Sequence, residues 1–199
     1  MSKTITYLMG CVLFSLGASS FILSNLGTDP LDVFAIGIKQ TFGLMIGTTQ
    51  SLFALLCLIT WSIINRFKLP PISTFLTFFI CGYLIDFFIW LCKDVYDLNC
   101  YIKLFIGVSL CTISSSLIIM SGFGIRAMDL LAITLNEKTN KPFWLYKGAF
   151  EVLLLLVGWI LGGPIGIGTL SFLLGVGWLI QPTMRMLVSF GIPNFSSVK

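Results

Sequence analysis

The sequence contains the same pattern twice. Residues 27–38 read GTDPLDVFAIGI and residues 124–135 read GIRAMDLLAITL, so that a glycine opens each pattern and an aspartate stands sixth. The offset between them is 124 − 27 = 97 residues. A second match follows at an offset of 177 − 82 = 95, where GYLI at 82–85 is answered by GWLI at 177–180. Self-similarity at nearly the same offset indicates a unit that is built twice.

The composition places this duplicated chain in lipid. Hydrophobic residues make up 57% of it and charged residues only 10%, and its mean hydropathy is +1.00. A soluble domain carries about 25% charged residues. The net charge of +4 does not point to nucleic acid, because the cations lie between apolar runs, where they set membrane orientation.

We therefore predict an all-α integral membrane protein, a single membrane domain over residues 1–199. Crossing a bilayer takes about 20 residues. Six apolar runs reach that length: 5–24, 45–64, 72–92, 104–121, 145–162 and 167–188.

Each half, 5–92 and 104–188, then holds three transmembrane helices and one short helix that does not cross. The short helices are expected at 30–42 and 127–137, inside the segments 26–43 and 122–142. In the first of these segments, the Asp-Pro at its start and the glycine at its end are typical helix boundaries.

The distribution of Lys and Arg gives an orientation. With six spans, nine of these residues fall on the side of the N-terminus and three, Lys39, Lys93 and Lys103, on the other. Cytoplasmic loops carry the excess of Lys and Arg, so both termini are expected in the cytoplasm. Three spans in each half then turn the second repeat upside down relative to the first.

Asp32 and Asp129 are the leading candidate site residues. A charge at the centre of the bilayer costs at least about 2.5–3.5 kcal/mol, so each such residue needs a reason. Both lie in the first turn of a short helix, where free N–H groups face outward. The carboxylates could cap the helix, bind a cation or take up a proton, and the sequence leaves these roles open.

Two further charged pairs stand out. Asp29 and Arg126 occupy equal positions of the two repeats (126 − 29 = 97), and they either form an ion pair near a two-fold axis or are unrelated interfacial charges. Lys147 and Glu151 are spaced i, i+4 and can face each other on one helix. Lys147 could instead extend to the cytoplasmic edge.

The sequence offers little for metal, cofactor or enzyme chemistry. Histidine is absent, and neither CxxC nor HExxH occurs among the motifs. We therefore expect no metal, no cofactor and no enzymatic activity, although the Asp32/Asp129 pair could imitate an acid dyad. Cys92 and Cys100 flank a polar loop and could pair if that loop faces an oxidising side.

The motifs GTDPLDVFAIGI, GIRAMDLLAITL, LGGPIGIGT and GWLIQP resemble the YczE-like, YitT-related bacterial membrane proteins. The resemblance implies a multi-pass protein of the bacterial plasma membrane whose activity is poorly defined. It rests on eight residues: Gly27, Pro30, Asp32, Gly124, Asp129, Gly166, Gly168 and Thr169. The chain departs from the pattern at Asp29, where a small residue is usual, and at Ala127, where proline is expected.

The predicted function is transport of a small solute or ion along a pathway lined by Asp-bearing short helices. The alternative is a substrate-capturing or accessory membrane subunit of a larger complex. The expected partners are the lipid bilayer and an unknown small solute or ion, and the chain could also form a homo-oligomer.

Reporter fusions test the predicted topology. Fusions after Lys68 and after Lys199 should read cytoplasmic, and a fusion after Asp97 should read external, because of the nine-to-three distribution of cations. A cytoplasmic signal at Asp97 would contradict the topology and, with it, the inverted repeat.

Overall fold

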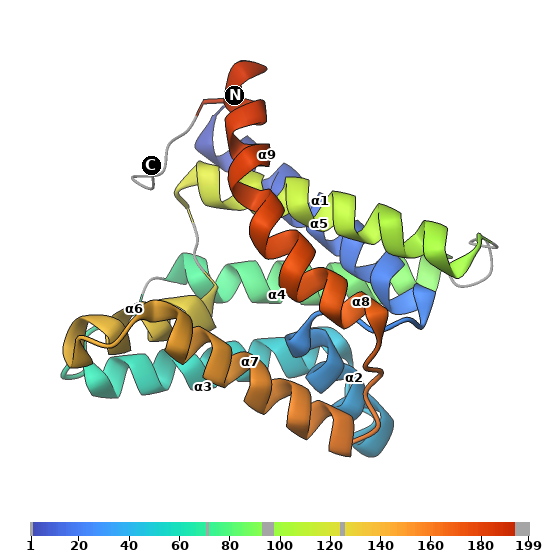
Figure 1. Cartoon of the computed structure of the whole chain (residues 1–199). Helices are drawn as coiled ribbons and strands as arrows, with labels where there is room; N and C mark the ends of the chain where they lie inside the picture. The colour runs from blue at the N-terminus through green and yellow to red at the C-terminus, as the bar shows by residue number, and fades with distance from the viewer. Residues whose placement is uncertain (1, 71, 93–97, 124–125, 194–199) are drawn as a thin grey trace.

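The computed structural model describes residues 2–70, 72–92, 98–123 and 126–193, and these form helices with no strand among them (Figure 1). In chain order, the elements are α1 (Lys3–Ser24), α2 (Pro30–Phe42), α3 (Ile46–Ile64), α4 (Ile72–Cys92), α5 (Cys100–Ser121), α6 (Ala127–Thr139), α7 (Phe143–Ile160), α8 (Ile167–Leu170), the π-helix η1 (Ser171–Val176) and α9 (Gly177–Ser189).

Helix boundaries repeat at the offset seen in the sequence. Helix α5 begins and ends 97 residues after α1 (100 − 3 and 121 − 24), and α6 does the same after α2 (127 − 30 and 139 − 42). The first short helix has the predicted bounds, while the second extends two residues beyond the predicted end at 137. The duplication in the sequence is therefore also a duplication of helices.

The ends of α1 and α5 show the same local chemistry. Ser24 Oγ donates to the carbonyl three residues earlier at 2.6 Å and accepts from the N–H two residues later at 3.2 Å. Ser121, 97 residues on, makes the same two bonds at 2.6 and 3.2 Å. Each helix then ends in a left-handed residue, Asn25 and Gly122 respectively. The two helices therefore end in the same way.

Helix α2 is bounded as its sequence predicts. Asp29 is the N-cap and accepts a bond from the N–H of Leu31 at 2.7 Å, and Pro30 occupies the first helical position. Gly43, at φ 72°, ends the helix in the left-handed conformation. Thirteen residues at 1.5 Å each give a helix of about 20 Å, too short for a hydrocarbon core of about 30 Å.

Four helices are long and apolar enough to cross a membrane: α1, α3, residues Ser73–Cys92 of α4, and α5. The fifth predicted span corresponds to α7, which has 18 residues and carries both Lys147 and Glu151. The sixth corresponds to α8, η1 and α9, which together are bent by 53°. The structure thus supports an all-helical membrane fold with four clear spans and a broken fifth candidate.

Helices α1 and α5 lie side by side and antiparallel, in close contact at glycines (Figure 1). A Cβ on Gly10 would lie 2.7 Å from the side chain of Ile118, and a Cβ on Gly107 would lie 2.6 Å from the ring of Phe21. These contacts are reciprocal, since 107 − 10 = 97 and 118 − 21 = 97. Two copies related by a two-fold axis make reciprocal contacts of this kind.

A second reciprocal pair joins the halves elsewhere. Gly37 of α2 approaches Gly158 of α7 so closely that a Cβ on Gly37 would lie 2.6 Å from the Gly158 carbonyl oxygen. The residues 97 positions from each, Thr134 (134 − 37) and Trp61 (158 − 61), also meet, because the Trp61 indole donates to the Thr134 hydroxyl at 2.8 Å. Contacts between α1 and α5, and contacts of α2 with α7 and of α3 with α6, are therefore both reciprocal at the offset of 97 residues.

Polar and apolar side chains are distributed as lipid requires. Large apolar residues face outward, and Trp90, Phe105 and Ile160 are each more than 70% exposed. Serines such as Ser15 and Ser114 are fully buried and bond to carbonyls inside the bundle. Small hydroxyl residues at helix interfaces are typical of membrane proteins. In the structure, Cys92 and Cys100 are free thiols and do not form the disulfide that their spacing allows.

The close approach of α1 and α5 makes a stability prediction. Gly17→Ala should lower the free energy of unfolding by roughly 1–3 kcal/mol, because its Cβ would lie 2.9 Å from the backbone nitrogen of Cys111. Gly148→Ala, in α7 with nothing within 4 Å of a Cβ, is the matched control and should be neutral or slightly stabilising. Thermal unfolding in detergent measures both, and equal stability of the two variants would contradict the packing.

Candidate functional site

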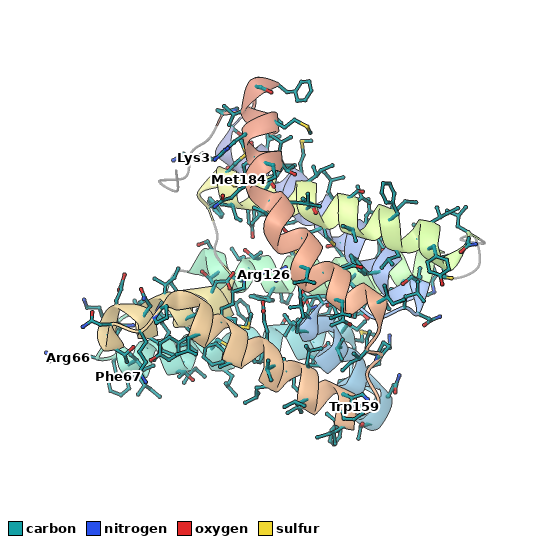
Figure 2. The ribbon with its side chains drawn as sticks, viewed as in Figure 1. Lys3, Arg66, Phe67, Arg126, Trp159 and Met184 are labelled. Carbon is teal, nitrogen blue, oxygen red and sulfur yellow. The ribbon has the colours of Figure 1, made fainter. Side chains whose placement is uncertain are left out.

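A cavity of about 450 Å³ lies inside the helical bundle, and both halves of the chain line it. All six candidate site residues from the sequence are among its lining residues: Asp29, Asp32, Arg126, Asp129, Lys147 and Glu151. Figure 2 shows Arg126 near the centre of the molecule, between the two groups of helices. The structure therefore brings into one place residues that lie up to 122 positions apart (151 − 29).

The loop that leads into α2 is fixed by the glycine-rich loop that leads into α8. The N–H of Gly168 donates to the carbonyl of Leu26 at 2.7 Å. Gly27 has φ +100°, which favours glycine, and a Cβ there would lie 2.6 Å from the nitrogen of Gly166. The glycines of two distant motifs thus pack backbone against backbone and set where α2 begins. That position in turn places Asp29 and Asp32 at the cavity.

Asp29 and Arg126 form an ion pair across the two halves. Arg126 Nη1 donates to Asp29 Oδ2 at 3.2 Å, while Asp29 Oδ1 caps α2. The Arg126 guanidinium also lies over the rings of Phe14 and Phe172, at 5.2 and 5.8 Å from their centroids. Such cation–aromatic contacts stabilise a cation that has left water. Of the two alternatives from the sequence, the structure shows the ion pair.

Asp32 is held by neutral groups. Its carboxylate is 2% exposed, and it accepts a bond of 2.6 Å from the amide of Gln50 and a longer one of 3.4 Å from the hydroxyl of Thr28. Among the described residues, no ion pair joins it to a Lys or Arg. Asp32 is therefore a buried acid whose direct partners carry no positive charge.

Asp129 and Glu151 share one cation. Lys147 Nζ lies 3.7 Å from Asp129 Oδ1 and 3.9 Å from Glu151 Oε1, so that the i, i+4 pair on α7 faces the short helix α6. Neither separation is a hydrogen bond, and the buried Oδ1 of Asp129 has no hydrogen-bond partner in the described residues. The lysine compensates two carboxylates without bonding closely to either.

Sequence reasoning missed the role of Gln50. It lies in a run of polar residues, Thr48 to Ser51, near the start of the predicted second span 45–64. Yet Gln50 and Lys147 are themselves related by the repeat offset (147 − 50 = 97), as Asp32 and Asp129 are. In each half, a residue of the helix after the short helix reaches the first-turn aspartate. Applying the offset of 97 to every polar residue would have found it.

Asp86 has a structural role away from the cavity. Its carboxylate accepts bonds from the N–H groups of Ile46 and Gly47, at 3.3 and 2.7 Å, and Lys39 lies 3.7 Å away. Helix α3 has no side-chain cap of its own at Met45, so Asp86 supplies the missing acceptor from α4. Asp86 therefore joins α4 to the start of α3, which is a packing role.

The remaining walls of the cavity are mainly apolar and aromatic. They include Phe14, Phe78, Ile118, Ile119, Phe172 and Val176. No group of His, Cys, Asp or Glu able to hold a metal ion occurs within the residues that were described. A charged region with one apolar side can bind a small molecule that has both a polar and an apolar part.

The chain is similar to a family of unknown function and to two bacterial proteins. A family model described as "Family of unknown function (DUF6198)" matches residues 1–185. The chain is 29% identical over 186 residues to the "Uncharacterized protein YyaS" of Bacillus subtilis, covering 92% of each chain. It is 28% identical over 177 residues to the "Uncharacterized membrane protein YczE" of the same organism, covering 88% of this chain and 82% of the relative. No solved structure matches the chain.

The Asp29–Arg126 pair gives a prediction for stability. Asp29→Asn keeps the cap on α2 but leaves the guanidinium without its counter-charge, so unfolding should become easier by roughly 1.5–3 kcal/mol. The double variant Asp29→Asn with Arg126→Gln should regain part of this loss. Chemical unfolding in detergent would give the free energies of unfolding of the wild type, the two single variants and the double variant. Lys39→Gln is the control, because it removes a more exposed ion pair and should lower the free energy of unfolding by less than about 1 kcal/mol. Strict additivity of the two single changes would contradict a direct interaction.

Proposed function

The chain belongs to the DUF6198 family of unknown function, and we propose that it is a transporter or channel for a small solute or ion. The observation that carries this proposal is the cavity, because both repeats contribute equivalent residues to it. Asp29, Asp32 and Gln50 come from one half, and Arg126, Asp129 and Lys147 come from the other, each 97 positions on. Binding sites formed where two repeats meet are typical of secondary transporters.

The proposed membrane arrangement is an inverted repeat of six spans. Early residues of α1 meet late residues of α5, so the two helices run in opposite directions, and the reciprocal contacts support a two-fold rotation between them. If both helices cross the bilayer, the axis of that rotation lies in the membrane plane. Helix α7 serves as a fifth span, since its 18 residues extend about 27 Å, and α8, η1 and α9 together form a broken sixth.

The location follows from the same arrangement. The nine-to-three distribution of Lys and Arg supports cytoplasmic N- and C-termini. The bacterial relatives and the printed description of one of them as a membrane protein support a multi-pass protein of the bacterial plasma membrane.

The two halves differ in one respect that bears on transport. Helices α3 and α4 pack closely, and a Cβ on Gly82 would lie 2.7 Å from the Cα of Gly47. Helices α7 and α9, their counterparts in the second half, diverge from the loop that joins them (Figure 1). A difference of this kind between equivalent helices supports a pathway that opens to one face of the membrane at a time.

We propose no chemical conversion in this cavity. Its charged groups interact with one another through ion pairs and an amide, an arrangement suited to binding and releasing a solute. A substrate-capturing or accessory subunit of a larger complex is the competing interpretation, and it would bind the same solute without moving it.

Flux measurements on proteoliposomes test the proposal. Capacitively detected currents would be recorded for panels of inorganic ions, organic cations, organic anions and pH steps, and radiolabelled uptake would cover neutral amino acids and sugars. We expect at least one panel to give a protein-dependent signal. Asp32→Asn and Asp129→Asn should abolish it, because Asn can still cap a helix but carries neither charge nor an exchangeable carboxyl proton.

Glu137→Gln is the matched control, since Glu137 is an exposed acid on the same short helix as Asp129. This variant should retain full flux. Full flux in the Asp32→Asn/Asp129→Asn double variant would remove both residues from the pathway. Absence of protein-dependent flux in every panel would reject the transporter and leave the accessory subunit.

A further inference from the structure

The charges around the cavity do not balance. Four carboxylates and two cations line it: Asp29, Asp32, Asp129, Glu151, Arg126 and Lys147. With all six ionised, the cavity carries a net charge of −2 (2 − 4). A buried charge without a partner is costly, by several kcal/mol in a protein interior. Protons on the carboxyl groups or positive charge from a bound solute would balance this excess.

The pairing within the cavity shows where that positive charge is missing. Arg126 is committed to Asp29, at hydrogen-bonding distance, and its face is covered by Phe14 and Phe172. The other three carboxylates have one cation between them. Lys147 stands beyond hydrogen-bonding distance from both of its acids, and the described residues give Asp32 only neutral donors.

The size and walls of the cavity indicate what kind of cation fits. A volume of about 450 Å³ is in the range of small-molecule sites and far exceeds a bare inorganic ion. The described acids do not cluster in a metal-binding geometry. The apolar wall includes aromatic rings, and two of these pack against the guanidinium of Arg126, so aromatic surface in this cavity already contacts one cation of the protein.

We propose that the cavity binds a small organic cation, with an ammonium group beside Asp129 and Glu151 and its apolar part against the aromatic wall. This proposal rests on the proposed function, because it names the class of solute for the same site. In this arrangement Lys147 competes with the solute for the two carboxylates. The lysine therefore limits the affinity for the cation.

Binding of charge-matched probes tests the proposal without requiring transport. Benzylammonium, benzyl alcohol and benzoate share a ring and differ in charge, and tetraethylammonium is a second cation. Binding to the full-length protein in phosphatidylcholine nanodiscs would be measured by ligand-observed NMR, with empty nanodiscs as the blank. Both cations should bind saturably and at least about tenfold more tightly than benzyl alcohol, and benzoate should not bind.

Two variants separate a specific effect from misfolding. The double variant Asp129→Asn with Glu151→Gln should weaken cation binding at least about tenfold. Lys147→Gln should strengthen it, because the competing charge is removed and a glutamine stands there, as Gln50 does in the other half. A misfolded protein does not gain affinity, so this second result is diagnostic. Glu137→Gln, outside the cavity, should leave affinity unchanged.

Three results would overturn the proposal. They are binding of benzoate at least as tight as that of the cations, weaker cation binding in Lys147→Gln, and no saturable binding of either cation up to about 10 mM, the weak limit for ligands of this size. Cation binding without flux would reject the proposed transport and keep this inference. Flux confined to anions or neutral solutes would keep transport and reject the cation.

Discussion

The arrangement of the short helices α2 and α6 around the cavity depends on the ion pair between Asp29 and Arg126. Each residue stands immediately before a short helix, at equal positions of the two repeats, so their contact at 3.2 Å fixes the two helix starts against each other. A charge inside a membrane protein is tolerated only with a partner or water. Because each of these charges has its partner in the opposite half, neither half could bury this region alone.

The other charged groups follow from the same constraint. Once α2 and α6 begin at the centre, their first-turn aspartates must face the cavity, and each needs a donor from the helix that comes next. Gln50 supplies an amide to Asp32, whereas Lys147 supplies a charge near Asp129. The two halves thus share positions but differ in charge at two of the three. The site therefore has equivalent positions in the two halves but an unequal distribution of charge between them.

Much of this architecture could be predicted from the sequence, because it depends on local signals. Asp29, Pro30 and Gly43 mark the ends of α2 through capping and φ preferences, and the structure has those ends. The offset of 97 residues predicted equal roles for Asp32 and Asp129, and both line the cavity. The function of these residues, the six spans and their inverted orientation remain predictions.

The rest could not be predicted, since it depends on contacts between distant residues. Nothing local marks Gln50 as the partner of Asp32, or Asp86 as the acceptor for the N–H groups of α3. The apolar run at 167–188 has the length of a straight span, yet it contains a π-helix and bends by 53°. The hydropathy of a segment indicates its length and polarity but does not predict whether the helix bends.

An experimentally determined structure in lipid nanodiscs would test the central claim, that two oppositely oriented repeats enclose one charged cavity. Our account predicts that residues 3–64 superpose on residues 100–160 by a rotation of about 180° around an axis in the membrane plane. Asp29 and Arg126 should then be within hydrogen-bonding distance near that axis. Two halves with the same orientation in the membrane, or an Arg126 that lies at the lipid surface away from Asp29, would contradict it.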